Sequence, residues 1–228
     1  MEALRRAQAE SADGIEFDVQ LSADGELFLF HDADARRVCG RGVDVAALAW
    51  RELQELRVFG RHPIPHIDEA LAAMESWRGA EIFFDLHQPR ADLAEAVARK
   101  LARSSVRERA YVLDFYKSRR LLAAAKKAEP SVLIAAMPGP PWNARACCDL
   151  GASAISLGWD GRLTRALYRG ACFLHDVGAE VKLAQARGVA VSGGVAYDPE
   201  DVRYFLAQGM DGIWADDLAM VRGALERS

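Results

Sequence analysis

The chain has 228 residues, of which 51% are hydrophobic and 27% are charged, a composition typical of a folded globular protein. Its formal net charge of −4 argues against a dedicated nucleic-acid binder, because such proteins use Lys and Arg to neutralise phosphates. No apolar run approaches the ~18 residues that a membrane span needs, and the first residues lack an apolar leader. We therefore expect no membrane span and a cytoplasmic location.

Strand-like and helix-like patterns alternate along the chain. Short β-branched or aromatic runs predict strands over residues 15–20, 26–31, 81–86, 110–114, 132–136, 153–157, 189–193 and 212–215. Helical spacing of apolar residues is clearest over 91–102, 117–127 and 199–208. The alternation predicts an α/β fold with a parallel sheet. No glycine-rich nucleotide loop follows a strand, so a (β/α)8, or TIM, barrel fits better than an open sheet. No linker divides the sequence, which predicts a single domain over residues 1–228.

The second predicted strand joins the first through a short turn instead of a helix. Residues 21–25 read LSADG, and an Asp-Gly pair such as Asp24-Gly25 is a strong hairpin signal. We therefore expect residues 26–31 to form a hairpin extension of the strand at 15–20, not a separate strand of the barrel.

Acidic side chains gather on two of the predicted strands. Glu16 and Asp18 are two residues apart, so they point to the same face of their strand. Such a pair inside a barrel is unfavourable without a positive partner, and the oxygen-binding cations Mg²⁺ and Ca²⁺ suit it. Asp85 offers a third carboxylate near the C-terminal end of its strand, where barrel enzymes place their sites, and His87 shares its face. The alternatives are an arginine ion pair for the first two carboxylates and a helix cap for Asp85.

Two histidines of the N-terminal half, His31 and His66, are interpreted differently. His31 ends the hairpin strand and could act as a general acid, since imidazole titrates near neutral pH. The alternative for His31 is an ordinary polar residue at the rim. His66 lies just before a predicted helix, and we expect it to cap that helix instead of taking part in catalysis.

Together these segments resemble the glycerophosphodiester phosphodiesterase family. The stretch ADGIEFDVQLSADGELFLFHD at residues 12–32 carries a carboxylate pair, an Asp-Gly turn and a His-Asp pair at the family's spacing. LAWRELQEL at 48–56 and IPHIDEAL at 64–71 extend the similarity, and residues 188–217 resemble the family's last two βα units. The resemblance implies a TIM-type barrel enzyme that cleaves a glycerophosphodiester with water, giving glycerol 3-phosphate and an alcohol.

The resemblance also assigns roles to single residues. Glu16 and Asp18 correspond to metal ligands, and Asp85 stands where the family has a metal-binding Glu. His31 corresponds to the acid that protonates the leaving alcohol. The implied cofactor is Mg²⁺ or Ca²⁺, which would neutralise charge on the phosphoryl oxygens. His87 stands in place of a family Lys and could contact the phosphate when protonated.

Two further features depart from the family pattern. The family begins with a strand that ends in His-Arg-Gly, whereas Met1 already lies in the helix that follows it, and the printed sequence contains no His-Arg-Gly. We therefore expect a barrel without its usual first strand, the second catalytic His and a phosphate-contacting Arg. Two explanations compete: the start is truncated and this strand lies upstream of Met1, or the chain is a degenerate relative that has kept part of the site. The edge beside residues 15–20 would be open, or covered by a second copy of the chain or by the N-terminal helix. Residues 194–197, Gly-Val-Ala-Tyr, replace the family's Trp-Thr-Val-Asn, so a substrate-packing Trp is missing.

The leading hypothesis is a metal-dependent phosphodiester hydrolase of small-molecule glycerophosphodiesters, with a place in lipid and glycerol metabolism. Its activity would be weak or lost, because one positioned acid or base contributes about 10²- to 10⁴-fold to a rate. The alternative is a catalytically inactive barrel that binds a phosphorylated ligand or a protein partner. A third hypothesis is a lyase of the sphingomyelinase-D type on the same barrel plan, which would release a cyclic phosphate.

Overall fold

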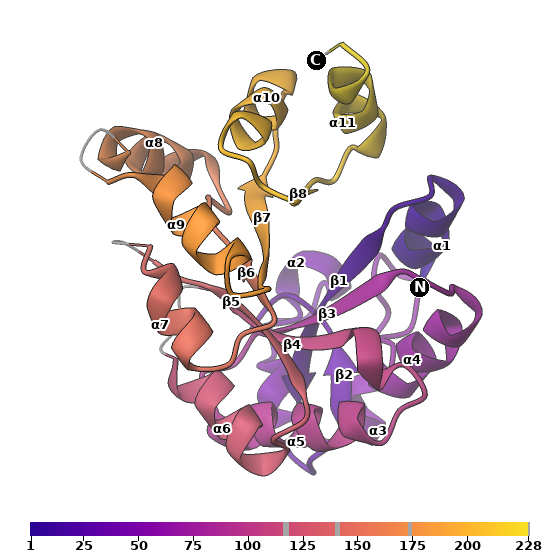
Figure 1. Cartoon of the computed structure of the whole chain (residues 1–228). Coiled ribbons are helices and arrows are strands. Elements are labelled where there is room, and N and C mark those ends of the chain that lie inside the picture. Colours follow the sequence, from indigo (N-terminus) through magenta and orange to yellow (C-terminus); the bar gives the residue numbers. More distant parts are fainter. Residues whose placement is uncertain (116–118, 140–141, 173–174, 228) are drawn as a thin grey trace. The chain divides into compact units, whose positions relative to one another are not determined.

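The computed structural model describes residues 1–115, 119–139, 142–172 and 175–227, which form two compact units (Figure 1). The first unit is Met1–Leu113 with Arg120–Leu133, and the second is Asp114–Arg119 with Ile134–Ser228. Strands and helices alternate in both units, which confirms the predicted α/β class. Among the described residues, no helix combines the length and the apolar character that crossing a membrane requires.

The first unit contains the N-terminal strands. Its elements in chain order are α1 (Glu2–Ala9), β1 (Gly14–Leu21), β2 (Leu27–Leu29), α2 (Arg36–Cys39), the 3-10 turn η1 (Val45–Ala47), α3 (Trp50–Leu53), α4 (Ile67–Ser76), β3 (Glu81–Leu86), α5 (Ala91–Ala102), the 3-10 turn η2 (Arg107–Arg109), β4 (Ala110–Phe115) and α6 (Arg120–Ala128). The strand predicted at 81–86 and the helix predicted at 91–102 have the observed bounds. The helix predicted at 117–127 is seen from Arg120 onward, and part of its predicted start lies outside the described residues.

The strand β1 lies between two partners in this unit. It pairs in parallel with β3 over residues 14–19 and antiparallel with β2 through residues 19–21, so the predicted hairpin is confirmed. β3 pairs in parallel with β4. Phe17 and Phe84, which are register partners, stack with their ring centroids 5.7 Å apart. Because side chains alternate along a strand, Glu16 and Asp18 point to the opposite face. Within this unit, no strand pairs with residues 14–17 on the side away from β3.

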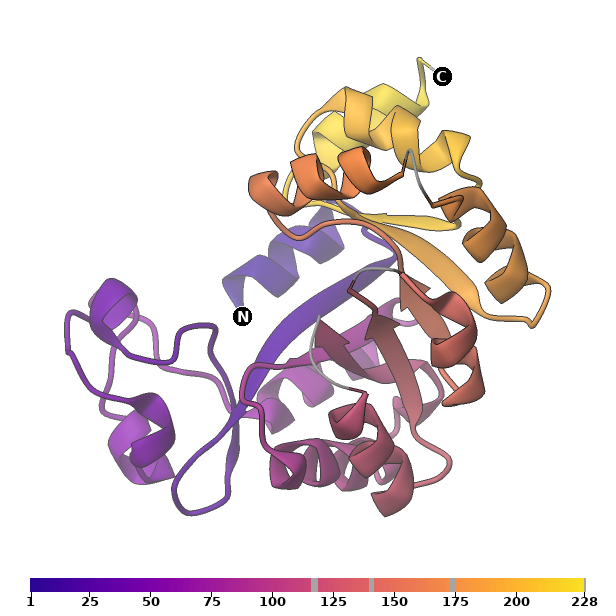
Figure 2. The same cartoon turned by 90° about the vertical axis from the view of Figure 1, so that its left-hand side faces the viewer.

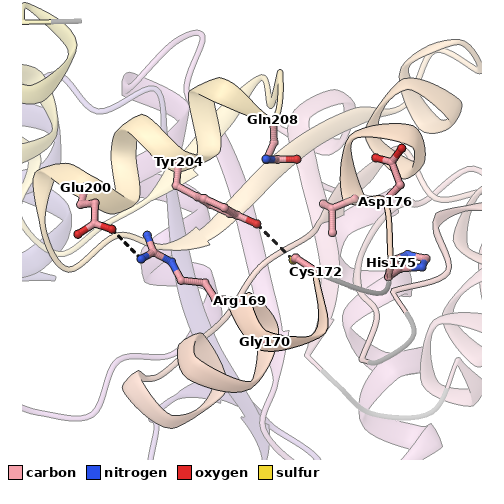
Figure 3. Close-up of a pocket in the computed structure, with 9 residues that line it drawn as sticks. Arg169, Gly170, Cys172, His175, Asp176, Glu200, Tyr204 and Gln208 are labelled. Atoms are coloured by element: carbon pink, nitrogen blue, oxygen red, sulfur yellow. Dashed lines mark hydrogen bonds and ion pairs between the residues drawn. The ribbon is translucent and has the colours of Figure 1, made fainter.

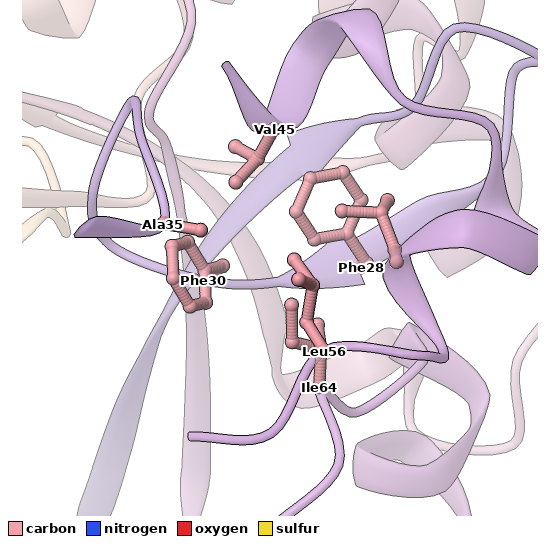
Figure 4. Close-up of a cluster of buried hydrophobic side chains, with 7 residues drawn as sticks. Phe28, Phe30, Ala35, Val45, Leu56 and Ile64 are labelled. Carbon is pink, nitrogen blue, oxygen red and sulfur yellow. The ribbon is translucent and has the colours of Figure 1, made fainter. Parts of the chain in front are cut away.

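The segment between β2 and α4 has a small hydrophobic core of its own (Figure 4). Figure 2 shows the segment, in indigo and purple, projecting to the side of β1. The buried side chains of the cluster are Phe28, Phe30, Ala35, Val45, Leu53, Leu56 and Ile64. Full burial of a Leu, Ile or Phe side chain contributes about 1.5–3 kcal/mol, so the cluster gives this otherwise loop-rich segment a defined structure. His31 lies on this segment directly after Phe30, and its position therefore depends on the cluster.

The second unit contains four parallel strands. Its elements are β5 (Leu133–Met137), α7 (Ala144–Asp149), β6 (Ala154–Ser156), α8 (Arg162–Ala171), α9 (Val177–Gln185), β7 (Ala190–Val195), α10 (Pro199–Ala207), β8 (Gly212–Trp214) and α11 (Leu218–Leu225). β6 pairs with β5 and β7, and β7 pairs with β8. Each strand ends within two residues of its predicted bounds.

Two glycines of β7 allow the strand to approach its neighbours closely. A β-carbon on Gly194 would lie 2.1 Å from the carbonyl oxygen of Trp159, and one on Gly193 would lie 2.4 Å from the ring of Phe205. Trp159 is fully buried, and its Nε1 donates to the carbonyl oxygen of Val195 at 2.8 Å. Only glycine fits at these two positions. The packing of this chain therefore requires Gly194 where the family has a Trp.

Candidate active site

Three carboxylates converge on one face of β1 and β3. β1 positions Glu16 and Asp18, and β3 positions Asp85, the direct register partner of Asp18. One carboxylate oxygen from each of the three residues lies within 4.8 Å of the other two. The structure therefore brings together all three residues that the sequence suggested as metal ligands.

The positive partner of these carboxylates is His87. Its Nε2 lies 2.7 Å from Asp18 Oδ1 and 2.9 Å from Asp85 Oδ2, while its Nδ1 donates to the carbonyl oxygen of His31 at 2.9 Å. Burial lowers the pKa of His87, but the hydrogen bonds and charges of the two aspartates outweigh this effect and raise it to about 10. Among the described residues, an imidazolium thus takes the place of the arginine considered as an alternative.

One imidazolium does not satisfy the whole cluster. Glu16 Oε1 and Asp85 Oδ1 are buried and have no hydrogen-bond partner among the described residues. Burial raises the pKa of Glu16 well above its usual range, and the negative charges of Asp18 and Asp85 raise it further. Buried, unpaired carboxylate oxygens that face one another fit a divalent cation, which takes oxygen ligands and offsets their repulsion. The residues present therefore suit the metal that the sequence predicts.

Asp85 does not cap the helix that follows it. The N-cap position of α5 is Arg90, whose side chain makes no capping hydrogen bond. Asp85 is 4% exposed and faces Asp18 and His87 instead. His66 does cap α4, because its Nδ1 accepts a hydrogen bond from the backbone N–H of Asp68, as the sequence predicted.

His31 lies beside the carboxylate cluster and belongs to a chain of polar contacts. Its ring centroid is 4.7 Å from that of His87, and its side chain is 64% exposed. Its Nδ1 lies 2.8 Å from Asp32 Oδ1, and Arg37 donates to both oxygens of Asp32 at 2.7 and 2.8 Å. The hydrogen bond from Arg37 is the main reason why the pKa of Asp32 falls to about 2, with a smaller contribution from His31. Sequence reasoning did not single out Asp32 or Arg37, although the His-Asp pair was part of the motif.

Two buried amides hold the loop that carries His31. Gln20 Nε2 donates to the carbonyl oxygens of Phe30 and Asp32 at 2.6 and 2.9 Å, on either side of His31. Gln88 Nε2 donates to Gln20 Oε1 at 3.2 Å, and Gln88 Oε1 accepts from the backbone N–H of Leu21. Both glutamines are buried. Sequence reasoning missed them, and the available signal was the place of Gln20 in β1, two residues after Asp18 and therefore on the same face as Glu16 and Asp18.

A cavity of about 920 Å³ in the second unit contains none of these residues (Figure 3). It is lined by Arg169, Gly170, Cys172, His175, Asp176, Val177, Glu200, Tyr204 and Gln208. Several of its polar groups already pair with one another: Arg169 donates to Glu200 at 2.8 Å, and the Tyr204 hydroxyl donates to Cys172 Sγ at 3.3 Å. We therefore place the candidate site at the carboxylates, whose buried oxygens lack a partner, and not in this cavity.

Comparison with known proteins points to one family. The model of the glycerophosphoryl diester phosphodiesterase family matches residues 1–220. The crystal structure of a glycerophosphodiester phosphodiesterase from Parabacteroides distasonis ATCC 8503 has a TM-score of 0.79 at 19% identity, covering 98% of this chain and 88% of that chain. An Oleispira antarctica phosphodiesterase in complex with its product sn-glycerol-3-phosphate has a TM-score of 0.77 at 18% identity, covering 98% of this chain and 89% of that chain. A glycerophosphodiester phosphodiesterase from Thermotoga maritima has a TM-score of 0.74 at 16% identity, with coverages of 97% and 89%.

The similar crystal structures and the family match confirm the predicted TIM-barrel type of α/β fold. A search of the curated proteins found no match.

Proposed function

Because the chain belongs to the glycerophosphoryl diester phosphodiesterase family, we propose that it hydrolyses glycerophosphodiesters slowly to glycerol 3-phosphate and an alcohol. The observation that carries the proposal is the cluster of Glu16, Asp18 and Asp85 with His31 beside it. The Oleispira antarctica phosphodiesterase, which shares the fold, was solved with sn-glycerol-3-phosphate, and this supports a small phosphorylated ligand. Function is argued from the site, because a barrel fold alone serves many reactions.

In this proposal, Glu16, Asp18 and Asp85 hold one divalent cation, Mg²⁺ or Ca²⁺. When bound, the ion supplies charge neutralisation and orientation for the phosphoryl oxygens of the substrate. The chain's own contribution is a fixed set of oxygen ligands, two of which lie side by side because they are register partners on adjacent strands. The unpaired oxygens of Glu16 and Asp85 are the atoms that support this role.

His31 is the group that we propose protonates the leaving alcohol oxygen. Its Nδ1 pairs with Asp32, which leaves Nε2 free to hold the proton that departs with the alcohol. The exposed side chain of His31 gives a substrate access to that atom. Neither His87 nor His66 serves as a partner base, because Nε2 of His87 is held by Asp18 and Asp85, and His66 caps a helix. A site that has His31 as its one acid–base group is expected to work about 10²- to 10⁴-fold more slowly than a site with two such groups.

The experiment is a product assay on the full chain. Purified protein with Mg²⁺ or Ca²⁺ is incubated with glycerophosphocholine, and glycerol 3-phosphate is measured together with cyclic phosphate. We expect glycerol 3-phosphate from the wild type, none above background from Glu16→Gln or His31→Asn, and wild-type release from the control His62→Gln, whose side chain is exposed and distant in sequence from the site. A cyclic product would identify a lyase instead.

A second candidate function follows from the single acid–base group that the described residues place beside the carboxylates. A site with carboxylates and only one available acid–base group could bind a phosphorylated ligand without turning it over. Glycerol 3-phosphate binding by calorimetry, combined with no product from any of these incubations, would favour this non-catalytic role. The cytoplasmic location and the covering of the open β1 edge by a second copy stay predictions from the sequence.

A further inference from the structure

His87 differs in chemistry from the carboxylates around it, because it places a ring nitrogen among oxygen ligands. Its Nε2 is 2.7 Å from Asp18 Oδ1 and 2.9 Å from Asp85 Oδ2. We propose that His87 is a nitrogen ligand of this centre and makes it prefer transition-metal dications such as Co²⁺ and Zn²⁺ over Mg²⁺ and Ca²⁺. The inference rests on the metal site of the proposed function and replaces the expectation that His87 contacts phosphate.

The ring of His87 already has the orientation of a metal-binding histidine. Nδ1 donates to the carbonyl oxygen of His31 at 2.9 Å, which directs Nε2 toward Asp18 and Asp85. Histidines that bind metals almost always donate their second ring N–H to a carbonyl, a carboxylate or water, which fixes the tautomer and leaves the other nitrogen for the ion. The side chain is only 21% exposed, so the protein and not solvent sets the direction of the ring.

The imidazole of His87 does not pair with all the buried carboxylate oxygens of the site, and the remaining oxygens suit a metal ion. The side chain of Asp85 is 5% exposed and contacts His87 through Oδ2, while Oδ1 has no hydrogen-bond partner in the part of the chain that the structure describes. Glu16 Oε1 is likewise buried and has no hydrogen-bond partner among the described residues. A cation that binds these oxygens can also take the place of the proton on Nε2, and that proton is released to solvent. The nitrogen lone pair then faces the ion.

The resulting donor set favours a different class of metal from carboxylates alone. Oxygen ligands suit Mg²⁺ and Ca²⁺, whereas imidazole suits Zn²⁺, Co²⁺, Ni²⁺ and Fe²⁺. A further imidazole is close, because ligand atoms of Asp18, His31 and His87 also lie within 4.8 Å of one another. We assign only His87 to the ion, since both of its nitrogens are directed by the protein, whereas Nε2 of His31 is left for the substrate.

The competing interpretation is that His87 contacts the substrate phosphate. Both of its ring nitrogens are already engaged, one by a backbone carbonyl and the other by two carboxylates. A phosphate contact would require the ring to leave Asp18 and Asp85. If His87 is a metal ligand, replacing it changes the binding constant of the metal. If His87 contacts the substrate, replacing it changes the binding constant of phosphate instead.

The first test is metal titration of the full chain by calorimetry, with Co²⁺ and Mg²⁺ as the probes. The variants are His87→Gln and His87→Lys, with His62→Gln as the matched control. The chain has four free cysteines, so the binding removed by Glu16→Gln defines the signal of the carboxylate site. We expect both His87 variants to lower the ratio of Co²⁺ to Mg²⁺ affinity by about 10-fold or more, with no change in the control, because the loss of even an outer-shell partner of a metal ligand costs about 10- to 100-fold in metal affinity.

The second test detects the nitrogen directly. A histidine bound to Co²⁺ through Nε2 keeps its Nδ1 proton, which gives a paramagnetically shifted NMR signal that disappears in deuterated water. We expect this signal in the wild type and in His62→Gln, and not in His87→Gln. Circular dichroism of each variant checks that the fold is retained.

The outcomes separate this inference from the proposed function. If neither cation binds, the metal centre itself is wrong. If both bind and the affinity ratio is the same in His87→Gln, the carboxylate centre stands and the role of His87 is overturned. If His87→Gln instead weakens binding of inorganic phosphate and leaves the metal ratio unchanged, His87 is the phosphate contact.

Discussion

The Nδ1 atom of His31 lies 2.8 Å from Oδ1 of Asp32, so the carboxylate fixes which ring nitrogen faces outward. Arg37 donates hydrogen bonds to both oxygens of the same carboxylate. The arrangement leaves Nε2 of His31 as the atom that can meet a substrate. Orientation of an acid by a neighbouring carboxylate is a common way to keep a proton in the productive position.

Replacing Asp32 by Asn should slow turnover more than it weakens substrate binding. The amide can present its N–H to His31 and favour the wrong tautomer, so we expect kcat to fall by roughly 10-fold or more, within the ~10²- to 10⁴-fold that a positioned acid contributes. KM should stay within about twofold. Steady-state kinetics on glycerophosphocholine measure both constants. Asp34→Asn, an exposed neighbour on the same loop, is the control, and an equal loss in both variants would contradict the positioning role.

Replacing Arg37 by Gln should change how stability depends on acid. The pKa of Asp32 is about 2 in the folded chain, against about 3.9 for an unperturbed Asp. The lowered pKa of Asp32 therefore adds to the free energy of unfolding; this contribution is fully present above pH ~4 and is lost as the pH falls toward 2. Without Arg37 the folded pKa moves back toward the unfolded one, so unfolding midpoints in urea should differ less between pH 4.5 and pH 2.5 than in the wild type. Arg36→Gln should behave as the wild type.

Saturation with a divalent cation should stabilise the chain through Glu16. An ion at about 100 times its Kd adds about 2.7 kcal/mol, which corresponds to roughly 5–10 °C in Tm for a chain of this size. Thermal unfolding followed by circular dichroism, with the cation and with a chelator, measures this shift. Glu16→Gln should abolish it without lowering the Tm of the metal-free protein, because the change removes a buried carboxylate that Asp18 and Asp85 repel. Glu55→Gln, an exposed change, should retain the full shift.

Replacing Gln20 by Ala should destabilise the first unit and disturb the site together. The change leaves the carbonyl oxygens of Phe30 and Asp32 without their buried donor, and leaving such groups unsatisfied costs about 1–3 kcal/mol each. Urea unfolding gives the loss in free energy. The exposed Gln54→Ala is a control for which we expect a change below about 0.5 kcal/mol. A destabilised Gln20→Ala chain with unaltered kcat would show that the amides do not position His31.

Much of the fold could be predicted because it depends on local patterns. The bounds of β3 and α5 follow from their period of apolar residues, and the hairpin follows from Asp24-Gly25. Four residues carry too little periodicity to reveal a helix, so α2 was not predicted, and α3 was indicated only by the likeness of LAWRELQEL to a helix of the family. Their stability comes from the cluster around Phe28, which is assembled from residues far apart in the chain.

The sequence predicts which residues form the candidate site, but not which of their atoms contact one another. Strand alternation places Glu16 and Asp18 on one face, and the motif adds Asp85 and His31. Which atoms meet is decided by the register of β1 against β3, and this register sets Asp18 directly beside Asp85. No spacing in the sequence reveals that His87 would turn back onto both of them, because that depends on a carbonyl oxygen on the hairpin loop.

The close approach of Gly194 to Trp159 also has an evolutionary consequence. A β-carbon on residue 194 would lie 2.1 Å from the carbonyl oxygen of Trp159, so a single substitution cannot restore the family's tryptophan at this position. Any return would first require the backbone around Trp159 to retreat, and that tryptophan is itself fully buried. Residue 194 and the Trp159 segment can therefore change only together, and grafting the family's Trp-Thr-Val-Asn onto residues 194–197 should fail to give a folded chain unless the Trp159 segment is transferred with it.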